Sequence, residues 1–342
     1  MKAVRIHEHG GSEVLRYEEI PQPAPRPEEV LVRVRACALN RLDLAVRRGI
    51  PGQKIPLPHI LGSDAAGEVA AVGERCSRAK VGDRILLAPA QSCRQCPECV
   101  AGRDNLCRQY ALLGYFLEGV NAEYIAVPEV YAIPIPGDLS FEEAAAVPLV
   151  FLTAWHMLVG RARIQPGEEV LVLGASSGVG SAAIQIARLF HCRVIATAGS
   201  EEKLARAREL GADEIIDHYR QNISDEVKRL TGRRGVDVVF EHVGAATWEH
   251  SVASLAHHGR LVTCGATTGP KGSLDLARLF WRQQSILGSF MGSLRELNEV
   301  LVFLGRRQLR AVIDKVYPLA EIRAAHERLE KGEQFGKIVV IP

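Results

Sequence analysis

Hydrophobic and polar positions divide the chain into a β-rich first part and a later part in which strands and helices alternate. Residues 29–38 alternate apolar and charged side chains, as expected of a strand with one buried face. Shorter strands, set off by Gly-Glu and Gly-Asp turns, are predicted at 2–6, 66–73, 83–88, 123–127 and 131–135. Their close spacing favours a small barrel or a distorted sandwich.

The middle of the chain opens with a capping box, Ser140 followed by Glu143. It predicts a helix toward Leu158 that Pro148 bends or interrupts. Strands then alternate with helices such as 201–210, which is typical of an α/β fold with a doubly wound, parallel, six-stranded sheet. The six strands are predicted at 169–174, 193–197, 214–216, 236–241, 260–264 and 285–290. The last part of the chain adds helices 294–304 and 319–331 and strands 312–317 and 336–341.

Composition sets broad limits. The 342 residues suffice for two domains, and 47% hydrophobic with 24% charged residues is typical of a soluble globular protein. The net charge of +2 gives no reason to expect nucleic acid or a membrane surface as a partner. Residues 1–10 lack the apolar core of a signal peptide, and no apolar run is long enough to span a membrane. We therefore expect a cytoplasmic protein whose eight cysteines are thiols, ligands or catalysts.

A Gly-rich turn joins the first of the six strands to a helix. Gly174, Gly178 and Gly180 let the backbone bend sharply and let a diphosphate approach the N–H groups at the helix start. The spacing is a variant of the dinucleotide-binding fingerprint, and an ordinary βα turn is the alternative. The strand before, the helix after and a second strand at 193–197 favour dinucleotide binding. The predicted binding turn also includes Ser176, Ser177 and Val179.

The end of the second strand bears on the choice of cofactor. NAD-specific sites usually carry an Asp or Glu there to hold the ribose hydroxyls. No acid stands at 197–200, and the candidate ligands of a 2′-phosphate are Ser200, Lys203 and Arg220. This pattern favours NADPH over NADH. Glu201 and Glu202 oppose that choice, and an exposed Lys is common on any helix.

Four cysteines form a C-x-x-C-x-x-C-x7-C loop, which suits a tetrahedral structural zinc in a reducing compartment. Because the protein supplies all four ligands, this metal would fix the loop and do no chemistry. An Fe–S cluster is the rival interpretation, but no electron-transfer signature accompanies the loop. The predicted ligands are Cys93, Cys96, Cys99 and Cys107.

Together these features resemble the medium-chain dehydrogenase/reductase superfamily of zinc alcohol dehydrogenases and quinone oxidoreductases. The resemblance also rests on GSDAAGEV at 62–69, VGDR at 81–84 and GKIVV at 336–340. It implies that residues 1–149 and 292–342 form a GroES-like domain and residues 150–291 a Rossmann domain. It also implies nicotinamide neighbours, although turn geometry alone could explain the glycines among them. These are Val243, Gly244, Gly265, Ala266, Phe290 and Met291.

The chain departs from zinc alcohol dehydrogenases at the catalytic zinc. In that group a Cys, the His of a G-H-E motif and a later Cys or carboxylate hold the metal. Asn40, Ser63 and Leu149 stand at the three corresponding positions. ALN-x-x-D at 38–43 resembles instead the zinc-free branch of quinone oxidoreductases and enone reductases.

The same comparison implies the candidate catalytic residues Asn40, Asp43 and Ser63. Asn40 is the candidate polar group near the substrate or nicotinamide, and a loop-capping Asn is the alternative. Asp43 is expected to orient its neighbours. An unconventional metal site made of His59, Asp43 and Asp64 is a further alternative.

Loss of the zinc ligands favours particular chemistry. Zinc lowers the pKa of bound water from 15.7 to about 7, on the order of 12 kcal/mol of help in forming an oxyanion. Reducing a quinone or an α,β-unsaturated carbonyl needs less, because hydrogen-bond donors worth roughly 3 kcal/mol each can carry the spread charge. We therefore expect an NADPH-dependent reductase of a small molecule.

Two other functions remain open. One is an alcohol dehydrogenase or carbonyl reductase with a non-standard catalytic metal or none, and the other is an NADPH-binding protein without turnover. The resemblance also implies a homodimer or homotetramer, in which the edge strand at 285–290 can pair with its twin.

Overall fold

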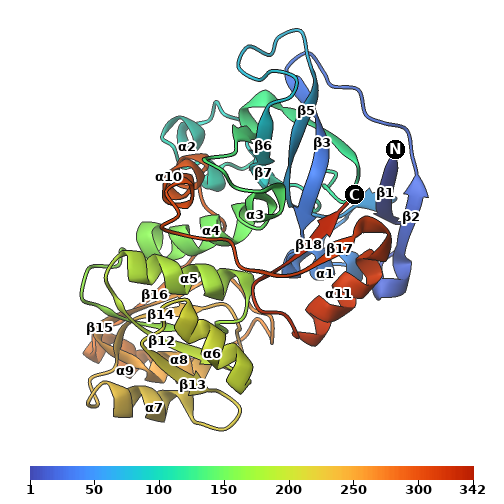
Figure 1. Ribbon diagram of the computed structural model, residues 1–342. Coiled ribbons are helices and arrows are strands. Elements are labelled where there is room, and N and C mark those ends of the chain that lie inside the picture. Colours follow the sequence, from blue (N-terminus) through green and yellow to red (C-terminus); the bar gives the residue numbers. More distant parts are fainter. The chain divides into compact units, whose positions relative to one another are not determined.

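The computed structural model describes residues 1–342 and divides them into two units (Figure 1). The first unit comprises Met1–Leu149 and Ser293–Pro342, and the second comprises Val150–Gly292. Each has a core of its own, built from buried aliphatic side chains. None of the helices has both the length and the apolar character needed to cross a bilayer.

The long strand β3 (Glu29–Ala38) is the centre of the first unit. It pairs antiparallel with β5 (Asp64–Val72), β9 (Tyr124–Pro128) and β18 (Lys337–Ile341). The whole sheet runs in the order β10-β6-β5-β3-β18-β17, with β9 paired to β3. Its other strands are β6 (Arg84–Leu87), β10 (Ala132–Pro134) and β17 (Ile313–Pro318). β3 has the predicted bounds, because its alternating side chains match its burial.

The register at the end of β3 brings distant segments together. Ala38 lies opposite Asp64 of β5 and opposite Val339 of β18. The pairing with β18 continues past the strand, since the Leu39 N–H donates to Ile338 O at 2.9 Å. An antiparallel register therefore sets Lys337 opposite Asn40.

Two smaller sheets and several helices complete this unit. The sheets are β2-β1-β4, formed by Leu15–Glu19, Lys2–Ile6 and His59–Ile60, and β7-β8, formed by Ala90–Gln91 and Ala111–Leu112. The α-helices are α1 (Arg41–Arg48), α2 (Pro97–Val100), α3 (Phe141–Ala145), α10 (Leu294–Gly305) and α11 (Ile322–Lys331). The 3-10 turns are η1 (Ser12–Val14), η2 (Asp104–Leu106), η3 (Glu129–Tyr131) and η5 (Leu319–Glu321).

The predicted capping box forms at the start of α3. Ser140 Oγ accepts from the Glu143 N–H at 3.1 Å, and Glu143 Oε2 accepts from the Ser140 N–H at 2.9 Å. The predicted interruption also occurs, because a new helix, α4 (Pro148–Trp155), begins at Pro148. A π-helical segment, η4 (His156–Arg161), follows α4.

The second unit is a six-stranded parallel sheet in the order β13-β12-β11-β14-β15-β16. α5 and α6 cover one face, and α7 and α8 cover the other (Figure 1). This confirms the doubly wound α/β fold. The strands are β11 (Glu169–Val172), β12 (Arg193–Ala198), β13 (Glu214–Asp217), β14 (Val236–Glu241), β15 (Leu255–Thr263) and β16 (Ser285–Gly288). The helices are α5 (Gly178–Leu189), α6 (Glu201–Glu209), α7 (Ile223–Leu230), α8 (Trp248–Ala253) and α9 (Leu276–Trp281).

Candidate active site

A buried polar cluster lies where β3 ends between β5 and β18. The Lys337 ammonium donates to Asp64 Oδ2 at 2.8 Å and to Asn40 Oδ1 at 2.6 Å. Asn40 Nδ2 donates to Asp64 Oδ2 at 2.9 Å. We call Asn40, Asp64 and Lys337 the lysine cluster. Asn40 is 5% exposed, Asp64 0% and Lys337 3%. Each charge has an opposite partner, whereas a single buried charge would be strongly destabilising.

The Asp43 carboxylate fixes the backbone on both sides of this cluster. It accepts from the Asn40 N–H at 2.6 Å and from the Gly62 N–H at 3.0 Å. Asn40 stands at the N-cap of α1, as the capping alternative expects. Its side chain also belongs to the lysine cluster, so the two interpretations do not exclude each other. Burial raises the pKa of Asp43 to about 6. These contacts are those of an orienting group.

The other two positions of the missing zinc ligands are also engaged by the protein. Ser63 Oγ donates to Leu113 O at 2.7 Å. The Leu149 side chain has no ligand atom, and its backbone N–H donates to Asp64 Oδ1 at 2.8 Å. Thus none of the three residues offers a free, metal-binding side chain of the usual kind.

The structure does not gather His59, Asp43 and Asp64, the alternative metal site, into a group whose ligand atoms converge on one point. His59 Nδ1 lies 4.0 Å from a carboxylate oxygen of Glu118, Asp43 binds backbone N–H groups and Asp64 binds Lys337. The group of His, Cys, Asp and Glu side chains that converges closely enough for a metal is the set of four cysteines. Asp43 and Asp64 are thus held by donors of the protein, whereas the buried His59 Nε2 has no hydrogen-bond partner.

The helix α1, which starts beside Asn40, is anchored by the fully buried Arg47. Its guanidinium donates to His326 Nδ1 at 3.1 Å and to Gly10 O at 3.3 Å, and it pairs with Glu330. Burial lowers the pKa of His326 to about 3, so this imidazole is neutral and accepts from Arg47. The contacts fix α1 against α11.

The Gly-rich turn after β11 has the geometry expected of a diphosphate site. Ser177 caps α5: its Oγ accepts from the Gly180 N–H at 2.9 Å and donates to Gly174 O at 2.8 Å. Gly174 has φ +59, and a Cβ at Gly180 would lie 2.3 Å from Gly174 O, so both positions need glycine. Ser176, Gly178 and Val179 belong to the same turn and helix start. The turn lies where the strand order reverses between β11 and β14, which is where open α/β sheets bind ligands.

Sequence reasoning missed two side chains at the end of β14: Glu241 holds the turn that follows its own strand, and His242 contacts the Gly-rich turn. The fully buried Glu241 accepts from the Val243 N–H at 2.6 Å, the Gly244 N–H at 3.0 Å and the Thr247 and Ser251 hydroxyls. His242 Nε2 lies 2.9 Å from Leu173 O. The only signal in the sequence was the order EHVG after an apolar strand. It was not enough to predict a buried Glu241, because a charged residue at the end of a strand usually faces solvent.

The candidate 2′-phosphate ligands lie around the end of β12. Ser200 Oγ accepts from the Lys203 N–H at 3.3 Å, and Arg220 pairs with Glu201 at 3.0 Å. Tyr219 was not predicted. The residue is 82% exposed, yet its ring covers Gly199, where a Cβ would lie 2.3 Å from a ring carbon. The rings of Tyr219 and His218 therefore line the surface beside Gly199.

The remaining predicted cofactor residues follow β14, β15 and β16. Since all strands are parallel, their carboxyl ends share one edge with the Gly-rich turn. Gly244 has φ +95 and packs on the next turn, where a Cβ would lie 2.9 Å from Ala266 Cα. The buried Met291 has φ +51, and its sulfur accepts from Thr153 Oγ1 at 3.8 Å. These residues are Val243, Gly244, Gly265, Ala266, Phe290 and Met291.

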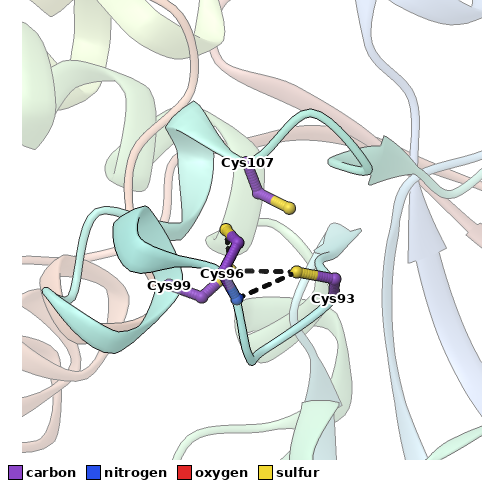
Figure 2. Close-up of side chains that lie close together, drawn as sticks. All are labelled: Cys93, Cys96, Cys99 and Cys107. Atoms are coloured by element: carbon purple, nitrogen blue, oxygen red, sulfur yellow. Dashed lines mark hydrogen bonds between the residues drawn. The ribbon is translucent and has the colours of Figure 1, made fainter.

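The four cysteines converge around α2 as Figure 2 shows. Their sulfurs lie within 4.8 Å of one another, with 3.5 Å between Cys96 and Cys99 and 3.9 Å between Cys93 and Cys99. A tetrahedral zinc with bonds of about 2.3 Å sets its sulfurs about 3.8 Å apart, so the residues fit that metal. Backbone N–H groups of Gln95 and Cys96 lower the pKa of Cys93 to about 6, which favours the thiolate.

The chain is similar in sequence and in fold to known proteins. The zinc-binding dehydrogenase model matches residues 178–306, and the alcohol dehydrogenase GroES-like domain model matches residues 26–137. Human quinone oxidoreductase is 30% identical over 100% of this chain and 98% of its own. The crystal structure of an NAD-dependent alcohol dehydrogenase is 47% identical, with a TM-score of 0.97 and full coverage of both chains. A variant of the crotonyl-CoA carboxylase/reductase AntE, solved with NADP, is 27% identical, with a TM-score of 0.93, covering 100% of this chain and 94% of that one.

Proposed function

Because this chain belongs to the medium-chain dehydrogenase/reductase superfamily, we propose that it transfers hydride from NADPH to a quinone or an activated α,β-unsaturated carbonyl without a catalytic zinc. Membership makes it an NAD(P)-dependent oxidoreductase with a GroES-like and a Rossmann-type domain. The proposal concerns the substrate class, the cofactor preference and the catalytic metal.

The lysine cluster carries the proposal. A catalytic zinc needs three protein ligands around an open position. Here Asn40, Ser63 and Leu149 supply no thiolate, imidazole or carboxylate, and Asp64 already holds an ammonium at 2.8 Å. A second cation beside that ammonium would add like charge to a buried site, which is electrostatically unfavourable.

The residues present suit a reaction that spreads its charge. When bound, NADPH supplies a hydride that adds to the β-carbon of the conjugated C=C bond and leaves NADP+. The electron pair of that bond moves toward the carbonyl oxygen, and a solvent proton completes the saturated product. Asn40 is the proposed donor to the oxygen. One of its N–H groups is held by Asp64, and the other makes only a long 3.4 Å contact with Ala38 O, so this second N–H is the one left to donate to a substrate.

The preference for NADPH rests on the end of β12. No carboxylate follows Ala198 directly, while Ser200 and Lys203 begin the next helix and Tyr219 packs on Gly199. Such groups favour a 2′-phosphate by charge and hydrogen bonding. Arg220 should attract the 2′-phosphate less than a free guanidinium would, because its charge is partly neutralised by Glu201 at 3.0 Å and Asp217 at 3.6 Å.

An alcohol dehydrogenase is the second candidate. The observation that favours it is the 47% identity with a protein described as an NAD-dependent alcohol dehydrogenase. That function requires oxidation of a simple alcohol, for which the residues described above offer no metal ligand of the usual kind.

A substrate panel separates the candidates. Purified protein is given NADPH or NADH with a quinone, an enone or an aldehyde, and NADP+ or NAD+ with an alcohol, and cofactor absorbance is followed. We expect NADPH oxidation with the quinone or the enone. Turnover of the alcohol alone would favour the second candidate, and tight NADPH binding without any turnover would refute both.

A pair of matched variants links the activity to Asn40. Asn40→Ala should lower kcat for the preferred acceptor about 100-fold, the loss typical of one transition-state donor, with the KM for NADPH little changed. Asn298→Ala removes an exposed Asn that bonds only within α10 and should leave kcat unchanged.

We also propose a homo-oligomer. β16 is the last strand of the six-stranded sheet, so one of its edges carries unpaired N–H and C=O groups. Nearby α9 exposes Phe280 and Trp281 by 70% and 77%. Size-exclusion chromatography with light scattering should give twice or four times the chain mass, and a monomer would contradict this.

A further inference from the structure

We propose that Lys337 is a positioning residue that fixes which end of the Asn40 carboxamide is available as a donor. This rests on the proposed function for its catalytic consequence, since Asn40 is the proposed donor to substrate. Its structural basis is the register of β18 beside β3, which sets Lys337 opposite Asn40.

The lysine cluster permits one orientation of the amide. An ammonium has only donors and a carboxylate has only acceptors, whereas a carboxamide has one end of each kind. Asn40 Oδ1 therefore faces Lys337 Nζ at 2.6 Å, and Nδ2 faces Asp64 Oδ2 at 2.9 Å. A half-turn of the amide would set N–H groups against the ammonium and the carbonyl against the carboxylate. Both charge-assisted hydrogen bonds would be lost in that orientation.

Lys337 also balances the charge of the site. Asp64 and Asp43 are fully buried carboxylates on either side of Asn40, and Lys337 is the ammonium bonded within this group. Without Lys337, the negative charge that develops on a substrate oxygen would form beside uncompensated carboxylates. An amide held between a cation and an anion is polarised further, so its N–H groups become stronger donors.

The direct test is the behaviour of the Asn40 amide itself. Protein labelled with 15N-asparagine is compared as wild type, Lys337→Met and Lys337→Arg, with the Asn40 signal assigned from its loss in Asn40→Ala. We expect the side-chain N–H exchange of Asn40 to become about 10-fold faster in K337M, corresponding to loss of one net hydrogen bond, and K337R to restore protection. Equal exchange in all three proteins would overturn the proposal, whatever the substrate proves to be.

Turnover measurements distinguish a positioning role of Lys337 from a role in stability alone. K337M should lower kcat about 100-fold with the KM for NADPH within about 2-fold, because the Asn40 donor loses its orientation while the proposed cofactor ligands are other residues. The double variant Asp64→Asn with Lys337→Met removes both charges, so it should regain thermal stability but not kcat. Recovery of kcat together with stability would show a merely structural role and refute the proposal.

A matched control uses another ion pair of the same unit. Arg328→Met breaks the pair between Arg328 and the largely buried Asp314, with contacts of 2.6 and 3.2 Å. It should lower the Tm without changing kcat or the exchange of the Asn40 amide. If the wild type fails to turn over every acceptor while K337M still frees the amide, the proposed function fails and the positioning role stands.

Discussion

Acidification should destabilise the protein through His326, the imidazole that anchors α1 by way of Arg47. Burial lowers the pKa of His326 to about 3 from an ordinary value of 6.5. The unfolded chain therefore binds a proton at this site at a higher pH than the folded chain does. The neutral imidazole therefore makes its full contribution to the free energy of unfolding above pH 6.5. This contribution is lost progressively as the pH falls from 6.5 toward 3.

The expected loss of stability follows from the difference between the pKa of His326 in the unfolded chain and its pKa in the folded chain. Each pH unit below 6.5 costs about 1.36 kcal/mol, so the loss is about 2 kcal/mol at pH 5. His326 is fully buried, so solvent screening does not reduce this figure. The Asp43 carboxyl, whose pKa is raised to about 6, acts in the opposite direction, because its protonated form is favoured in the folded state.

The comparison of wild type with His326→Gln isolates the effect. Gln keeps an acceptor for Arg47 but does not titrate, while Asp43 contributes equally to both proteins. Urea unfolding at pH 7.5, 6 and 5 gives the free energy of unfolding for each. The wild type should lose about 2 kcal/mol more than H326Q between pH 7.5 and 5. Parallel pH dependences would refute the reasoning.

Three further predictions concern the metal and the cofactor. Cys96→Ser should abolish zinc binding and lower the Tm by about 5 °C or more, whereas Cys76→Ser should keep the zinc; metal analysis and thermal unfolding check both. Gly180→Ala should weaken NADPH binding at least about 10-fold in calorimetry, because its Cβ would lie 2.3 Å from Gly174 O, and an unchanged Kd would contradict the assigned turn. Lys203→Ala should weaken NADPH about 10-fold and leave NADH unaffected, since one charge-assisted contact to the 2′-phosphate is lost; an equal effect on both would exclude that contact.

Local patterns predicted most of the fold. β3 and β14 have their predicted bounds, because each has a regular pattern of buried side chains. β15 begins at Leu255, five positions before the predicted start. Its first half contains His258 with φ +59, and its register against β14 shifts, so the pattern of a regular strand is broken there. The helix α1 was missed because it has only 8 residues, half of them charged.

Some residues of the candidate site could likewise be predicted from local sequence patterns, and others could not. The Gly-rich turn and the four cysteines are contiguous in sequence, so their chemistry could be predicted from spacing. Lys337 could not, since it bonds Asn40 from 297 positions away and the pairing of β18 with β3 brings them together. Glu241 was missed because its partners are backbone N–H groups and hydroxyls, which leave no pattern of charge in the sequence.

Metal content measured together with turnover tests the central claim most directly. Protein purified without chelator should contain one zinc per chain by elemental analysis, held by the four cysteines, and should oxidise NADPH with a quinone or an enone. Two zincs per chain, with turnover that disappears and returns with the second, would contradict a reductase whose lysine cluster stands where a catalytic metal would be held.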